Sequence, residues 1–184
     1  MSRWICLLLL ACASAHAAPN NAPSSDDLDR FVHEKTVLSQ LKEARHNVQD
    51  KAGEVVATAM GFLGVPYRRG GNNAETGFDC SGFIRTIYGQ ASGFILPRRA
   101  DQQAAATETI DKKDLQPGDL VFFNTMRRAF SHVGMYVGEG KFIHAPRSGA
   151  EVRVEDMRAS YWQRRFNGAR RVTTADADGN ASAN

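Results

Sequence analysis

The residues of this chain that are best suited to chemistry are one cysteine and two histidines. Cys80 lies in the run Gly77-Phe78-Asp79-Cys80-Ser81-Gly82, where a glycine-rich loop gives way to helical spacing, and His132 and His144 follow downstream. A thiol attacks as its thiolate, and a helix N-terminus or a nearby imidazolium favours that form. The pattern predicts a thiol nucleophile.

The two histidines are predicted to share one face of a β-hairpin. Gly138-Glu139-Gly140 fits a three-residue loop between their strands. With that loop, His132 opposes residue 146 and His144 opposes residue 134, so both side chains project from the same face as diagonal neighbours. One imidazole could then take the thiol proton while the other orients it. A two-residue loop would put the two on opposite faces.

Each of these residues also has a structural interpretation. Cysteine often serves as a small buried hydrophobe, and a lone histidine in a strand is often a satisfied structural residue. One Cys and two His are a conceivable zinc ligand set. The sequence has no CxxC or HExxH motif, however, and we predict no metal and no other cofactor.

The N-terminus has the features of an export signal. Arg3 precedes a short apolar stretch, and Ala15-His16-Ala17 fits a cleavage site. We predict a signal peptide over residues 1–17. Its removal also removes Cys6 and Cys12, which leaves Cys80 as a single thiol and marks it as a candidate reactive cysteine.

A second way to process the signal stays open. Leu9-Leu10-Ala11-Cys12 resembles a bacterial lipobox, and a lipidated Cys12 would anchor the protein to a membrane. In either case we expect an exported protein of the periplasm or cell envelope. Beyond the signal we predict a linker with an extra N-terminal helix over 18–50, a catalytic domain over 51–172, and a disordered polar tail over 173–184.

The hydrophobic pattern changes along the chain from helical to strand-like spacing. The spacing predicts helices over about 26–49, 51–63, 80–88 and 97–107, with a loop over 67–78. Short β-type runs follow at 120–123, 133–137, 141–145, 151–154 and 166–172. Helices followed by strands in hairpins indicate an α+β fold, with helices packed on an antiparallel sheet.

The excess of positive charge is concentrated in the predicted catalytic domain. Residues 51–172 contain 18 Lys and Arg against 12 Asp and Glu. An excess of this kind can serve solubility, or it can attract a polyanionic substrate or surface. We expect no nucleic-acid partner, because the chain has an export signal and no binding motif.

Five motifs in order resemble the NlpC/P60 cysteine peptidases and together cover roughly residues 51–172. They are Gly64-Val65-Pro66-Tyr67-Arg68-Arg69-Gly70-Gly71, Gly77-Phe78-Asp79-Cys80-Ser81-Gly82-Phe83, Leu115-Gln116-Pro117-Gly118-Asp119-Leu120-Val121-Phe122-Phe123, Ser131-His132-Val133-Gly134-Met135-Tyr136-Val137-Gly138 and Phe142-Ile143-His144-Ala145.

The resemblance implies a papain-like fold with the nucleophile at a helix N-terminus. It assigns the nucleophile to Cys80, the general base to His132 and the third polar residue to His144. It places Tyr67 beside the oxyanion, and it places three further residues along the substrate cleft, namely Asp79, Ser81 and Ser131.

The function implied by the resemblance is cleavage of peptidoglycan stem or crosslink peptides through a thiolate acyl-enzyme. The cleaved bond is open between the γ-D-glutamyl–diamino acid bond and the D,D-crosslink. Two alternatives are amidase or transpeptidase chemistry on the same scaffold and a non-catalytic wall-binding regulator. We expect a monomer, with an open role for residues 26–49.

Overall fold

The computed structural model describes residues 25–125 and 128–173. The predicted signal peptide, Cys12, and residues 174–184 of the predicted tail lie outside the described residues. The elements up to the last strand are α1 (Ser25–Met60), β1 (Asn72–Asn73), β2 (Gly77–Phe78), α2 (Cys80–Ser92), α3 (Ala100–Ala105), β3 (Glu108–Ile110), η1 (Lys112–Asp114), β4 (Leu120–Phe123), β5 (His132–Gly138), β6 (Lys141–His144), β7 (Arg153–Asp156), α4 (Ser160–Gln163) and β8 (Phe166–Arg171).

Helix α1 is continuous, and the predicted break near residue 50 is wrong. No proline interrupts the segment, and Gly53 inside a helix costs only about 1 kcal/mol relative to alanine. The chain divides into two compact units, residues 1–43 and residues 44–184, and the boundary between them lies within α1. In the second unit, Val55 and Ala59 of α1 are buried in the core.

The described part of the first unit is the N-terminal portion of α1. Its apolar side chains at Val37, Leu38 and Leu41 are exposed, with exposed fractions of 40%, 49% and 61%. The predicted extra helix is therefore present as the beginning of a longer one, and its role stays open.

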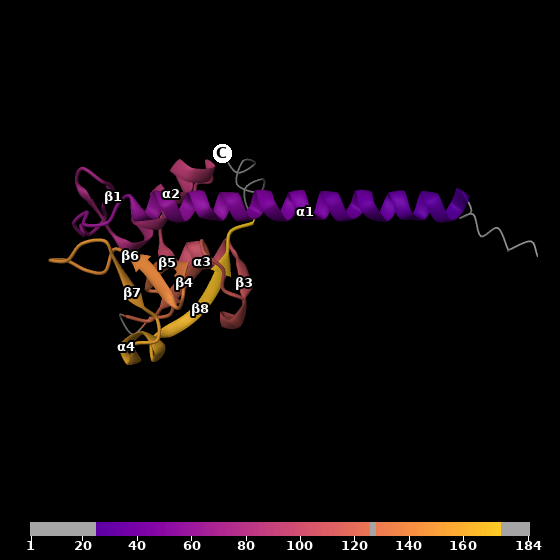
Figure 1. The fold of residues 1–184 in the computed structure, drawn as a ribbon. Coiled ribbons are helices and arrows are strands. Elements are labelled where there is room, and N and C mark those ends of the chain that lie inside the picture. Colours follow the sequence, from indigo (N-terminus) through magenta and orange to yellow (C-terminus); the bar gives the residue numbers. More distant parts are fainter. Residues whose placement is uncertain (1–24, 126–127, 174–184) are drawn as a thin grey trace, which may run out of the picture. The chain divides into compact units, whose positions relative to one another are not determined.

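The second unit is built on one six-stranded antiparallel sheet (Figure 1). The strand order is β3-β8-β4-β5-β6-β7, so β4, β5, β6 and β7 follow one another as a meander and β8 inserts beside β4. The predicted α+β fold with helices on an antiparallel sheet is confirmed.

The two faces of the sheet bury different side chains because successive residues of a strand point to opposite sides. Leu120 and Phe122 of β4 belong to the larger core, which also contains buried residues of α1 and α2. Val121 and Phe123 belong to a second cluster with Trp162 of α4. Figure 1 shows the strands between α2 and α4.

Several predicted boundaries shift in the structure. Helix α2 continues past Gly89 to Ser92 and ends at Gly93, which has the left-handed φ of 72° that a helix C-cap favours. Strand β7 begins at Arg153 rather than 151, because Glu151 forms an isolated bridge to Pro66 instead. The short elements β1, β2, β3, η1 and α4 were not predicted, since segments of two to four residues carry little periodic signal.

The N-terminus of α2 packs tightly against the loop that precedes it. A methyl group built on Gly82 would lie 2.1 Å from the carbonyl oxygen of Gly71, which is a backbone atom. Gly89 lies in the same helix with nothing within 4 Å of the corresponding position. Close approach of loop and helix therefore requires glycine at 82 but not at 89.

We predict that Gly82→Ala destabilises the protein by more than about 2 kcal/mol, because the added carbon overpacks against backbone that cannot move aside. The matched control, Gly89→Ala, is expected to be neutral or to stabilise by up to about 1 kcal/mol through helix propensity. Urea unfolding followed by circular dichroism measures both. Equal stabilities for the two variants would contradict this packing.

Candidate active site

Cys80 is the first residue of α2. Asp79 is the N-cap, and its Oδ1 accepts a 2.7 Å hydrogen bond from the backbone N–H of Gly82. Its Oδ2 accepts another, 3.0 Å long, from the N–H of Gly70 in the preceding loop. The cap thus fixes both the start of the helix and the loop beside it, and with them the position of the cysteine.

Arg98 completes the support of this helix N-terminus. Its guanidinium donates to both carboxylate oxygens of Asp79, at 3.0 Å and 2.6 Å, and to Ser81 Oγ at 3.0 Å. A bidentate pair of this kind is directional as well as attractive. Asp79 was predicted to line the substrate cleft, and the structure gives it this capping contact network.

Gln103 of α3 hydrogen-bonds to the backbone at the start of α2. Its Nε2 donates to the carbonyl oxygens of Ser81 and Pro97, at 3.0 Å and 2.9 Å, from a fully buried side chain. Sequence reasoning missed both Arg98 as a partner of Asp79 and Gln103. The predicted helix over 97–107 includes both residues, but helical spacing does not say which groups their side chains contact.

The thiol lies beside the start of β5. The backbone N–H of Val133 hydrogen-bonds to Cys80, and Val133 is the chain neighbour of His132. Tyr67 also faces this region: burial raises the pKa of its phenol, and the charges of Cys80 and Asp79 raise that pKa further. The predicted residues Tyr67, Asp79 and Cys80 are therefore brought together.

Ser131, which was predicted to line the cleft, is buried and bonded to the backbone. Its hydroxyl accepts a 3.0 Å hydrogen bond from the N–H of Thr125 and lies 3.3 Å from the carbonyl oxygen of Phe123. These contacts close the turn that leads into β5 immediately before His132.

The two histidines are in direct contact. His132 Nε2 lies 2.7 Å from His144 Nδ1, and both side chains are buried. The predicted register is observed, since Met135 pairs with Ile143 and Tyr136 pairs with Phe142, with a bulge at the loop. The same-face prediction for the histidines is confirmed by their contact.

A glycine makes room for this pair. A methyl group on Gly134 would lie 2.6 Å from the Phe142 ring and 3.1 Å from His144 Cβ. Gly134 is the residue that the predicted register places opposite His144. The absence of a side chain at this position allows the second imidazole to lie close to the first.

A carboxylate lies next to Nε2 of His144. Glu155 Oε1 lies 3.4 Å from His144 Nε2, and Arg153 Nε donates to the same oxygen at 2.6 Å. Trp162 Nε1 donates to Oε2 of the carboxylate. The Trp162 ring stacks on His132 at 5.9 Å and meets His144 edge-on at 5.2 Å. Sequence reasoning missed Glu155 and Trp162 because neither belongs to a recognised motif.

Burial sets the protonation states of the site. It lowers the pKa of His132 to about 3, with a smaller lowering by His144 and an opposing influence of Glu155. Burial also lowers the pKa of His144, which Glu155 opposes. Burial raises the pKa of Cys80, against the hydrogen bond from Val133. At neutral pH the site therefore holds a neutral thiol and neutral imidazoles.

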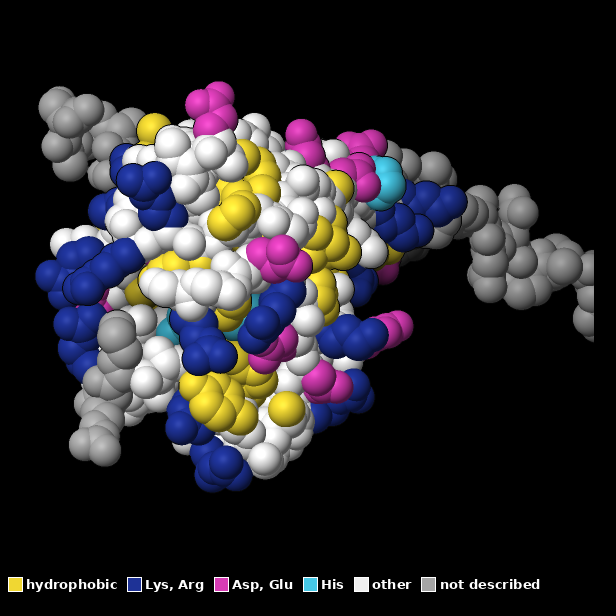
Figure 2. Space-filling view, turned by 90° about the vertical axis from the view of Figure 1, so that its left-hand side faces the viewer, with side chains coloured by type: hydrophobic (Ala, Val, Ile, Leu, Met, Phe, Trp, Pro, Cys, Tyr) yellow, Lys and Arg dark blue, Asp and Glu magenta, His cyan; other side chains and the backbone are white. Residues whose placement is uncertain are grey.

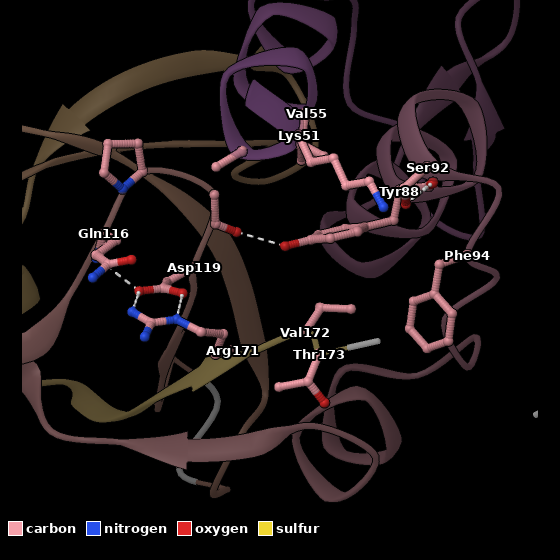
Figure 3. Close-up of a pocket in the computed structure, with 13 residues that line it drawn as sticks. Lys51, Val55, Tyr88, Ser92, Phe94, Gln116, Asp119, Arg171, Val172 and Thr173 are labelled. Carbon is pink, nitrogen blue, oxygen red and sulfur yellow. Dashed lines mark hydrogen bonds and ion pairs between the residues drawn. The ribbon is translucent and has the colours of Figure 1, made fainter. Parts of the chain in front are cut away.

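A cavity of about 380 Å³ lies away from these residues, within the second unit (Figure 3). Tyr88, Phe94 and Val172 line it, and the Asp119–Arg171 ion pair at 2.7 Å forms part of its wall. Neither Cys80 nor either histidine of the pair lines it. We therefore place the chemistry at the thiol, not at this cavity.

Within residues 25–125 and 128–173, no group of three or more His, Cys, Asp or Glu side chains could hold a metal ion. No helix within those same residues is long and apolar enough to cross a membrane.

The fold and the site define an α+β protein with a cysteine at a helix N-terminus and a histidine pair on the adjoining sheet. The NlpC/P60 family matches residues 64–171, which include every one of these residues. The chain belongs to the NlpC/P60 family.

The relatives include two proteins of Escherichia coli K12. Murein DD-endopeptidase MepH is 44% identical over 138 residues, which are 73% of this chain and 51% of MepH. Murein DD-endopeptidase MepS/Murein LD-carboxypeptidase is 32% identical over 173 residues, which are 91% of this chain and 88% of that protein. The chain thus spans about half of MepH but most of MepS.

Solved structures of the family share the fold. An NlpC/P60 family protein from Bacillus cereus ATCC 10987 superposes with a TM-score of 0.60 at 38% identity, covering 65% of this chain and 39% of that one. The NlpC/p60 domain of the peptidoglycan hydrolase SagA gives a TM-score of 0.58 at 31% identity, covering 66% of this chain and 98% of that domain.

We predict that alkylation of Cys80 by iodoacetamide accelerates with pH up to a midpoint above that of an ordinary thiol, about 8.5. A raised pKa keeps the thiol protonated at neutral pH, so the reactive thiolate forms only as pH rises. The measurement uses protein with Cys6 and Cys12 replaced by serine. The same protein unfolded in urea is the control. Fast alkylation that is independent of pH between 6 and 8 would contradict a Cys80 thiol that is neutral in the resting protein.

Proposed function

We propose that this protein is a cysteine peptidase that cleaves the peptides of peptidoglycan. The observation that supports this most is the buried contact between His132, at the start of β5, and His144, at the end of β6, with a thiol at the N-terminus of α2 beside β5. The relatives named as murein endopeptidases add the substrate class, and one of them is matched over 88% of its length.

In the proposed mechanism His132 is the general base. Its neutral imidazole takes the proton of the Cys80 thiol as the sulfur attacks the peptide carbonyl. The attack forms a C–S bond and places negative charge on the former carbonyl oxygen. Backbone N–H groups at the first turn of α2 and the Tyr67 hydroxyl are the proposed donors to that oxyanion.

The imidazolium formed on His132 then protonates the leaving amine, and the C–N bond breaks. The product is a thioester on Cys80, with His132 neutral again. A water molecule attacks this thioester and gives a proton to His132. The C–S bond then breaks, the imidazolium returns that proton to the sulfur, and the new carboxylic acid leaves and ionises, so that the thiol and the neutral base are restored. His144 is proposed to orient His132 throughout through their 2.7 Å contact.

The proposed bond is the D,D-crosslink between stem peptides. Both Escherichia coli relatives described above carry the name DD-endopeptidase. Crosslinked stems carry carboxylates, and exposed arginines at 68, 69 and 147 have no ion pair within the part of the chain described by the structure. Basic side chains gather along the left-hand edge of the face in Figure 2, which suits an acidic substrate.

The proposed site of action is the cell envelope, since peptidoglycan lies outside the cytoplasm. The predicted signal peptide over residues 1–17 supports export. Lipidation at Cys12 is the alternative anchor, and the mass of the mature N-terminus in membrane extracts distinguishes a free residue 18 from an acylated Cys12. We propose a monomer that needs no cofactor.

We predict that Cys80→Ala lowers turnover of a crosslinked muropeptide dimer by at least about 10³-fold, because the nucleophile is lost. Chromatography with mass spectrometry identifies the products as monomers for D,D-cleavage or as shortened stems for γ-D-glutamyl cleavage. A thermal melt within a few degrees of wild type is the control for folding.

Turnover that persists in folded Cys80→Ala protein would overturn the nucleophile assignment. Products in which an amine, rather than water, has taken the acyl group would identify the protein as an acyl transferase instead of a hydrolase. Shortened stems with intact crosslinks would overturn the choice of bond while leaving the thiol mechanism in place.

A further inference from the structure

Among the residues that the structure describes, Glu155 is the carboxylate that approaches the histidine pair, and none of the five motifs contains it. It lies on β7, next to β6 in the sheet, and β6 carries His144. His144 is completely buried, and its Nε2 has no well-aligned hydrogen bond among the described residues. Glu155 Oε1, 3.4 Å away, is the acceptor that lies within ion-pair distance of this nitrogen.

The carboxylate is held firmly in this position. Arg153 Nε donates to Oε1, and Trp162 Nε1 donates to Oε2, so both oxygens have a fixed partner. Trp162 also packs against both imidazole rings. The Trp162 side chain therefore both positions the Glu155 carboxylate and covers the two histidines.

The chain of contacts permits one productive arrangement of protons. An ionised carboxylate only accepts hydrogen bonds, so it favours a proton on His144 Nε2. A neutral imidazole carries one N–H, which leaves His144 Nδ1 as an acceptor. His132 Nε2 must then be the donor across the 2.7 Å contact. The remaining nitrogen of His132, Nδ1, is left without a proton and is able to act as a base.

The opposite arrangement is inactive. If His144 carried its proton on Nδ1, it would donate to His132 Nε2, and the His132 proton would sit on Nδ1. The nitrogen needed to receive the thiol proton would then be occupied. General base catalysis by His132 therefore requires the first of these two arrangements of protons.

We infer that Glu155 is a positioning residue that selects the base-competent tautomer of His132 through His144, with Trp162 holding its carboxylate in place. This inference rests on the proposed function, because it assigns His132 as the base. Among the described residues, the charged groups that act on the two histidines are Glu155 and Arg153, both from β7. The negative charge also stabilises the imidazolium that forms during the reaction.

The most direct test measures the tautomers without any substrate. Nitrogen-15 spectra of the imidazoles, in protein with Cys80→Ser, distinguish protonated from unprotonated ring nitrogens. We expect Nε2 of both His132 and His144 to be protonated and both Nδ1 atoms to be unprotonated. A proton on His132 Nδ1 in this protein would overturn the inference even if the protein cleaves peptidoglycan.

The kinetic test removes the charge and keeps the shape. We expect Glu155→Gln to lower kcat by about 10- to 100-fold, as for the orienting partner of a functional histidine, with KM changed less than about 2-fold. Its imidazole spectrum should show a mixture of tautomers. Glu155→Asp, which keeps the charge, should recover part of the lost kcat.

Asp156→Asn is the matched control. Asp156 is the next residue on β7, and it pairs with Arg158 at the surface rather than with a histidine. This variant loses the same charge and should keep kcat within about 2-fold of wild type. A Glu155→Gln variant that matches Asp156→Asn in kcat and in spectrum would overturn the inference. If wild type cleaves no muropeptide while the tautomers are as expected, the proposed function fails and the proton arrangement stands.

Discussion

The hydrogen bond between the two imidazoles of His132 and His144 is the contact on which the rest of the site depends. It needs two strands in one register, a hairpin loop that keeps both side chains on the same face, and a glycine opposite the second ring. It also needs burial, which keeps both rings neutral and makes their mutual contact strong. A shift of one residue in the β5–β6 pairing would move one ring to the other face of the sheet.

The thiol is positioned by a different part of the fold, and the two parts meet at the start of β5. Asp79 caps α2, Arg98 holds Asp79, and Gln103 holds the peptide group of Ser81. These contacts come from the residue before α2, from the segment between α2 and α3, and from α3 itself, not from the sheet. The helix N-terminus is thus fixed independently of the histidine pair, so that each half of the site can be perturbed separately by mutation.

Much of this site could be predicted from the sequence because its residues lie in short local patterns. The hairpin register followed from one loop, and the helix start at Cys80 followed from the step between a glycine-rich loop and a helical run. Glu155 and Trp162 could not be predicted in this way, because sheet pairing and packing bring them to the histidines from separate elements. The continuity of α1 was missed because spacing alone does not say where a helix without proline ends.

The central claim is that a thioester forms on Cys80 during cleavage, and partitioning with hydroxylamine tests it most directly. Cleavage of a crosslinked muropeptide in the presence of hydroxylamine is expected to yield a hydroxamate at the newly released carbonyl, because the amine competes with water for the acyl-enzyme. Its share of the product should rise with hydroxylamine concentration. Cleavage that yields only the free carboxylic acid at every concentration would contradict the account.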